Sequence, residues 1–204
     1  MPSTRLPIRT ISVMLAASTL SACAGVPLTS MLKLSRLLPL EADPAQIRVA
    51  VRADRAIALR TGDVTMGITY EAADNALSLQ EEFVVQVDRG AILPPELLRG
   101  LGEKEAVTIM ALSDSDARRF SRTQAKIRGA EANAEGGEGG FSLGVTYGCT
   151  NGPLPTEELL IDIYLQTALD DEFFVMNADV DLYATVMPDG QEIPRWPECE
   201  DDAA

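Results

Sequence analysis

The chain has 204 residues, no histidine and a net charge of −14. Without histidine it cannot use Ser-His-Asp or Cys-His catalysis, His-ligated zinc, or the usual general base near neutral pH. The negative charge repels nucleic acid phosphates and argues against nucleic acid binding. The acids are concentrated, since residues 129–204 hold one basic and 17 acidic residues. We interpret them as solvated faces, with divalent-cation binding as the alternative.

The first 22 residues are typical of a secretory signal peptide. Arg5 and Arg9 precede an uncharged, mostly apolar run of ten residues, which is too short to span a bilayer. This run leads into Leu20-Ser21-Ala22-Cys23. The sequence LSAC resembles the lipobox of bacterial lipoproteins, and the resemblance covers only residues 1–23. It implies that the Cys23 thiol takes a diacylglycerol and that Cys23 becomes the first residue of the mature protein.

A lipid on Cys23 predicts a location in the cell envelope, on a membrane surface that the domain does not span. In enteric bacteria an Asp after the lipidated cysteine retains lipoproteins at the inner membrane. Ala24 stands there instead, so the resemblance favours the outer membrane, on its periplasmic face. Residues 23–44 are expected to form the lipidated N-terminus and a tether. The helical leucine spacing over 28–40 fits either a tether that docks on the domain, which we favour, or an interfacial amphipathic helix.

Two further cysteines, Cys149 and Cys199, form an even pair once Cys23 carries lipid. Disulfides persist outside the cytoplasm, so we predict a bond between the two, with two unpaired thiols as the alternative. On the chain-entropy model, closing this loop stabilises the fold by about 4 kcal/mol. The absence of a CxxC motif argues against thiol-redox catalysis.

A single domain is expected over 45–194, followed by an acidic tail over 195–204. From residue 47 apolar and polar residues alternate, as in half-buried antiparallel strands, with Arg48 and Arg52 on the polar face of the first strand. The strands expected in the first part are 47–53, 64–70, 77–87 and 105–112, with a short helix over 94–102 that begins with proline and ends with glycine.

A helix is predicted over 114–128, with acidic residues at its start and basic residues towards its end. Spacings of three and four residues place four cations on one face: Arg118, Arg119, Arg122 and Lys126. We expect this basic patch to meet the acidic C-terminal half of the chain. Exposure to solvent and contact with a partner or lipid are the alternatives.

The acidic half begins with residues 129–140, which contain five glycines and no large apolar side chain, so we expect a mobile loop there. Alternation from Phe141 to Cys149 predicts a strand that aims Cys149 at the interior. Strands are also expected over 159–165 and 173–186, the latter with four residues facing inward: Val180, Leu182, Ala184 and Val186. The loop between them holds the weak candidates for a calcium site, Asp170, Asp171 and Glu172, although the EF-hand pattern is absent.

These patterns predict a mainly β fold: an antiparallel sandwich or partly closed barrel with one helix at about 114–128 and short accessory helices. We expect a non-catalytic envelope lipoprotein that acts as an assembly, accessory or protein-binding module without a cofactor. Its partners would be the membrane, through the lipid anchor, and an envelope protein that contacts edge strands or the basic helix. A ligand- or cation-binding lipoprotein is the alternative, followed by a carboxylate-dependent hydrolase.

Overall fold

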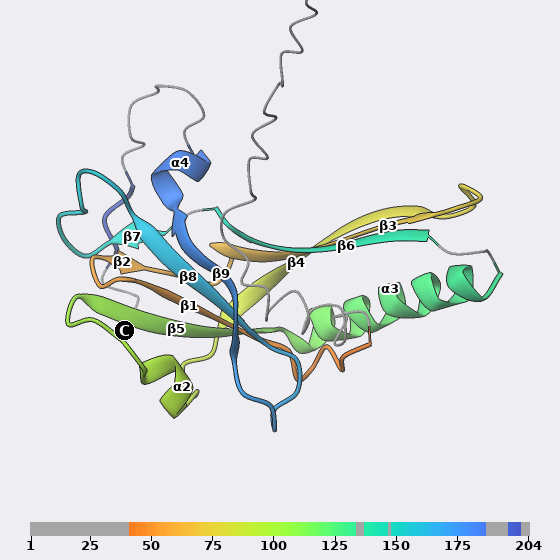
Figure 1. Cartoon of the computed structure of the whole chain (residues 1–204), viewed down its shortest axis with the longest axis horizontal. Helices are drawn as coiled ribbons and strands as arrows, with labels where there is room; N and C mark the ends of the chain where they lie inside the picture. Colours follow the sequence, from red (N-terminus) through yellow and green to blue (C-terminus); the bar gives the residue numbers. More distant parts are fainter. Residues whose placement is uncertain (1–40, 134–136, 147, 187–195, 201–204) are drawn as a thin grey trace, which may run out of the picture.

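The computed structural model describes residues 41–133, 137–146, 148–186 and 196–200. The expected signal peptide, Cys23 and segment 28–40 lie outside this part of the chain. Seven strands form one antiparallel sheet in the order β6-β3-β4-β5-β1-β8-β9, which curls into a half-barrel (Figure 1), and β2 pairs with β7 in a second small sheet. The expectation of a mainly β, partly closed antiparallel fold is confirmed.

The elements have the following bounds in chain order. The strands of the first part are β1 (Arg48–Asp54), β2 (Ile57–Ala58), β3 (Val64–Ala72), β4 (Ser78–Val87) and β5 (Glu105–Leu112). Those of the second part are β6 (Gly137–Val145), β7 (Cys149–Thr150), β8 (Leu160–Gln166) and β9 (Phe174–Asp181). The helices are α2 (Pro95–Leu98), α3 (Asp114–Asn133) and α4 (Leu182–Val186).

The main core fills the concave side of the sheet. Alternation in β3 buries Val64, Met66 and Ile68 completely, and their neighbours along the strand are more exposed. Helix α3 packs against this side, where Phe120 stacks on Phe83 of β4 with ring centroids 5.0 Å apart. Because each fully buried side chain of this size stabilises the fold by about 1.5–3 kcal/mol, hydrophobic burial holds α3 on β3, β4 and β5.

Helix α3 begins where its sequence predicts. The Ser113 hydroxyl accepts a hydrogen bond from the backbone N–H of Asp116 at 3.0 Å, and Asp114 and Asp116 lie in the first turn. The serine cap satisfies one of the free N–H groups of the first turn, and the two carboxylates complement the positive end of the helix dipole. No helix in the described ranges is both long enough and apolar enough to cross a membrane.

In the described parts of 129–140, helix and strand stand where we expected a mobile loop. Helix α3 continues to Asn133, and β6 begins at Gly137 and pairs with β3 along its whole length. Glycine permits this pairing: a Cβ atom on Gly140 would lie 2.5 Å from the Thr69 hydroxyl, and one on Gly137 would collide with the Tyr70 ring. The glycines that suggested mobility instead allow two strands to approach closely.

Two expected strands end earlier than their alternation predicts. The strand expected from Phe141 stops at Val145, and Cys149 lies in β7, paired with β2. Strand β9 stops at Asp181, and α4 follows. The Asp181 carboxylate accepts the backbone N–H of Tyr183 at 3.0 Å, which caps α4 and turns the chain out of the sheet. Ala184, expected to face inward, is consequently exposed.

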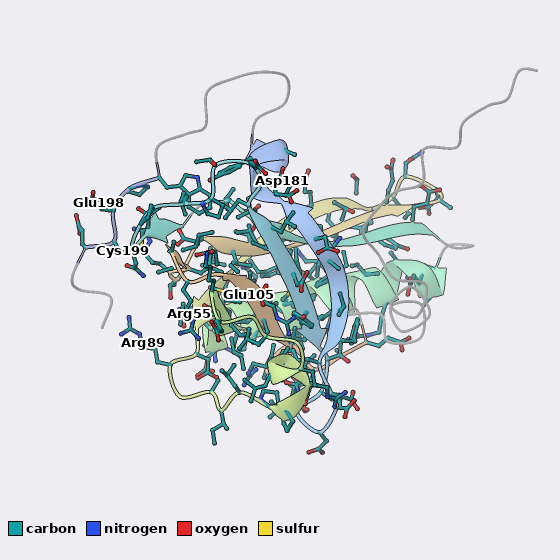
Figure 2. The ribbon with its side chains drawn as sticks, turned by 60° about the vertical axis from the view of Figure 1, so that its left-hand side comes forward. Arg55, Arg89, Glu105, Asp181, Glu198 and Cys199 are labelled. Atoms are coloured by element: carbon teal, nitrogen blue, oxygen red, sulfur yellow. A yellow bond between two sulfur atoms is a disulfide. The ribbon has the colours of Figure 1, made fainter. Side chains whose placement is uncertain are left out.

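The predicted disulfide between Cys149 and Cys199 is confirmed, and the two Cα atoms are 4.8 Å apart. Cys149 is fully buried, as its place in the alternation predicts. Thr150 fixes the tail further, because its N–H donates to Pro197 O at 2.8 Å and its carbonyl accepts Cys199 N–H at 3.0 Å. The acidic segment with Glu198 and Cys199 is thereby held at the same edge of the domain as Arg89 (Figure 2).

Candidate functional site

Arg119 is not part of the exposed basic patch that the sequence predicts, because its side chain packs on the sheet. Its guanidinium lies 4.1 Å from the centroid of the Phe83 ring and donates to the Glu81 carboxylate at 3.0 Å and to the Asp116 carboxylate at 2.9 Å. Both acids belong to the first half of the chain, so the expected pairing of Arg119 with the acidic C-terminal half is wrong. Helix α3 packs on β4, which brings Arg119 to Glu81, whereas β8 and β9 of the acidic half are at the other end of the sheet.

The other three cations remain together on the outer side of α3. Arg118, Arg122 and Lys126 are exposed, and their four-residue spacing aligns them on one face over about 12 Å of helix. No acidic residue occurs between Ala117 and Ala130. We call these three residues the basic stripe. It is a compact cationic surface on a strongly acidic chain.

The acidic turn after β8 does not gather its carboxylates. No group of three acidic or cysteine side chains in the described residues is arranged to hold a metal ion, and Asp170, Asp171 and Glu172 form no such group. Glu172 instead lies 4.0 Å from Arg99, and the Asp171 carbonyl accepts the Gln166 amide at 2.6 Å. Contacts with neighbouring residues therefore hold this turn in place.

The face of the sheet opposite α3 is also covered. Residues 88–104, which contain α2, cover it: Leu97 of this segment joins a second apolar cluster with Ala50, Ile109, Tyr164 and Phe173. The first-strand alternation places Arg52 on this face, as expected, but the face is not open to solvent. The Arg52 side chain is only 11% exposed.

Arg52 joins the covering segment to the sheet. Its guanidinium donates to the carbonyls of Leu97 and Arg99, at 3.0 Å each, and lies 3.6 Å from the Asp162 carboxylate on the neighbouring strand. Tyr164 donates its hydroxyl to the same carboxylate at 3.2 Å. The sequence analysis did not predict this network. The one signal in the sequence was Ala50, which lies between two arginines on this face of β1 and is small enough for the α2 segment to pack closely on the sheet.

A cavity of about 470 Å³ lies beside the disulfide, lined in part by Arg60, Arg89, Cys149 and Glu200. The Asp63 carboxylate accepts both the backbone N–H of Arg60, at 2.7 Å, and its side-chain Nε, at 3.2 Å. This hydrogen bond and the charge of Asp63 raise the pKa of Arg60. Among the described residues that line this cavity, Glu200 is the only one with a carboxylate, whereas glycoside hydrolysis by paired acids needs two.

Known proteins offer no guide to this arrangement. No family model, curated protein or solved structure matches the chain. Its function therefore has to be inferred from the residues and their geometry. Two features described above have a defined chemical character: the basic stripe of α3 and the α2 segment that Arg52 binds to the sheet.

Replacing Arg52 with methionine should lower the free energy of unfolding by about 2 kcal/mol, because it leaves Asp162 without its cation and frees two carbonyls. Methionine retains most of the apolar stem, so the loss is chiefly polar. Urea denaturation of the wild type and Arg52→Met measures the difference. The matched control is Arg55→Met, since the Arg55 side chain is exposed; equal effects at both positions would contradict the role of Arg52.

Burial, followed by the charge of Asp162, raises the pKa of Tyr164 to about 12. The folded state therefore holds the phenolic proton more tightly than the unfolded state, where the pKa is about 10. This contribution to stability should be complete below pH of about 10 and lost as the pH rises to about 12. Denaturation series across this range should show a shallower decline for Tyr164→Phe than for the wild type; parallel curves would contradict the prediction. Tyr183→Phe is the control for the other buried phenols.

Proposed function

We propose that this protein is a lipid-anchored, non-catalytic contact domain of the bacterial cell envelope. The LSAC sequence ending at Cys23 supports the anchor, and the Cys149–Cys199 disulfide suits an oxidising compartment. Ala24 after the lipidated cysteine favours the outer membrane. The anchor holds the domain at the membrane surface, where it acts as an assembly or accessory module for another envelope protein.

The observation that carries the proposed contact is the basic stripe. Arg118, Arg122 and Lys126 are exposed on one helix face of a chain whose net charge is −14. A uniformly cationic strip of this kind favours an acidic protein surface, because complementary charge steers association and sets the orientation of the partner. Arginine also pairs with carboxylates through two parallel hydrogen bonds, which adds geometric specificity.

The test is affinity purification of the full-length lipidated protein from its own membranes, followed by mass spectrometry. We compare the wild type with the triple variant Arg118→Gln, Arg122→Gln and Lys126→Gln. The matched control neutralises three other exposed cations: Arg55→Gln, Arg89→Gln and Lys104→Gln. A protein that co-purifies with the wild type and the control, and is lost with the first variant, supports the proposal. Identical protein sets for all three would refute the contact.

The anchor is tested separately by Cys23→Ser. The wild type should incorporate a fatty-acid label and fractionate with membranes, and the variant should do neither, because the serine hydroxyl does not replace the thiol that accepts the lipid. If the variant fractionated with membranes by the same route as the wild type, the lipoprotein assignment would fail.

A further inference from the structure

Four exposed apolar side chains lie on two connections of the domain that touch each other. Ile92, Leu93 and Leu98 belong to the segment that carries α2, and Leu169 to the β8–β9 loop; Ile92 is 90% exposed. We call these four residues the apolar tips. Both connections lie along the lower edge of the domain in Figure 1.

The two connections are held together and shaped in advance. The Glu96 carboxylate accepts the backbone N–H of Phe173 at 3.2 Å, and Arg99 lies 4.0 Å from Glu172. Arg52 of β1 holds the α2 segment on the sheet by donating to the carbonyls of Leu97 and Arg99. The projecting side chains are therefore presented from an ordered backbone, which reduces the entropy lost when they contact another surface.

The N-terminal chain joins the domain beside the same loop. The side-chain carbonyl of Gln46 accepts the backbone N–H of Leu169 at 3.4 Å. A little earlier in the chain, the Ala42 carbonyl accepts the Gln124 amide of α3 at 2.8 Å. The described chain therefore passes from α3 at Ala42 to the β8–β9 loop at Gln46, so a lipid anchor ahead of residue 41 would hold this edge of the domain close to the membrane.

We propose that the apolar tips are a second membrane contact, inserted at the boundary between headgroups and acyl chains of a phospholipid bilayer. This inference rests on the proposed lipid anchor and adds an orientation: the domain stands on its α2 and β8–β9 edge. Apolar side chains that project singly from loops can each insert between lipids, because a bilayer adapts its surface to the inserted group. The exposed Arg99, directly after α2, reaches the headgroups while its stem covers apolar surface.

The test uses the full-length lipidated protein in vesicles of phosphatidylethanolamine and phosphatidylglycerol. An introduced cysteine is the only free thiol once Cys23 is acylated and Cys149 and Cys199 are joined. A polarity-sensitive fluorophore is placed through Ile92→Cys or Leu98→Cys. The matched control is Thr156→Cys, an exposed site before β8, at the opposite end of that strand from Leu169.

Spin-labelled lipid in the vesicles should quench the fluorophore at 92 and 98 several-fold more strongly than at 156, and emission at 92 and 98 should shift to the blue. Equal quenching at all three sites, with the protein still floating with the vesicles, would overturn the membrane contact and leave the anchor intact. Failure to float with the vesicles would overturn both. Protection of 92 and 98 only after envelope proteins are added would assign the tips to a protein partner and also overturn the inference.

Discussion

Removing the Cys149–Cys199 disulfide should lower the free energy of unfolding by about 4 kcal/mol. The bond joins residues 50 apart in the sequence, and closing so long a loop restricts the unfolded chain. In the folded state the bond holds the tail against β7, where Thr150 makes hydrogen bonds with Pro197 and Cys199. A typical domain has a free energy of unfolding of about 5–15 kcal/mol, so this loss is a large part of the total. The reduced protein should therefore be only marginally stable.

Urea denaturation of the wild type with and without reductant measures this effect while both sulfur atoms stay in place. The double variant Cys149→Ala, Cys199→Ala is the control, and reductant should not change its stability. This variant should also be somewhat less stable than the reduced wild type, because Cys149 is fully buried and its truncation leaves a cavity. A difference below about 1 kcal/mol between the oxidised and reduced wild type would contradict the predicted contribution.

The strands whose two faces differ were predictable from the sequence. In β3 the alternation of Val64, Met66 and Ile68 with more exposed neighbours survives unchanged in the structure. The burial of Cys149 was also predicted, but from an alternation that ends at Val145; Cys149 is buried in β7, which pairs with β2. Alternating burial within a strand depends only on residues close together in the chain, so it can be predicted from the local sequence.

The elements that were not predicted depend on distant contacts. Gly137 and Gly140 form a strand because β3 offers them a partner with bulky side chains at Thr69 and Tyr70. Strand β9 ends because the Asp181 carboxylate caps the next helix. The local sequence around the glycines does not show that β3 will pair with them, and the sequence around Asp181 does not show that its carboxylate will cap a helix.

The candidate contact surfaces were predictable only in part. Helical spacing correctly placed Arg118, Arg122 and Lys126 on one exposed face, but it also included Arg119, which packs over Phe83. A difference of one position turns a helical side chain by about 100°, so a patch of cations at mixed spacings divides between solvent and core. The exposure of Ile92 had no sequence signal, because it follows from how the α2 segment crosses the sheet.

Replacing Phe120 with alanine should lower the free energy of unfolding by about 4 kcal/mol, the middle of the range for truncating a buried aromatic residue. Phe120 is fully buried and stacks on Phe83 with centroids 5.0 Å apart. It is the largest fully buried side chain that α3 contributes to the core. Urea denaturation measures the loss, and Phe141→Ala provides the matched control, because Phe141 is half-buried on the edge strand β6 and should have a smaller effect.

A double-mutant cycle with Phe83→Ala separates stacking from simple burial. If the two rings interact directly, the double variant should lose about 1 kcal/mol less than the two single variants added together. Arg119 provides an internal check, because its guanidinium lies over the same Phe83 ring and should lose that contact in Phe83→Ala but keep it in Phe120→Ala. Strict additivity would mean that the two rings contribute only through their separate burial and that the stacking adds nothing to stability.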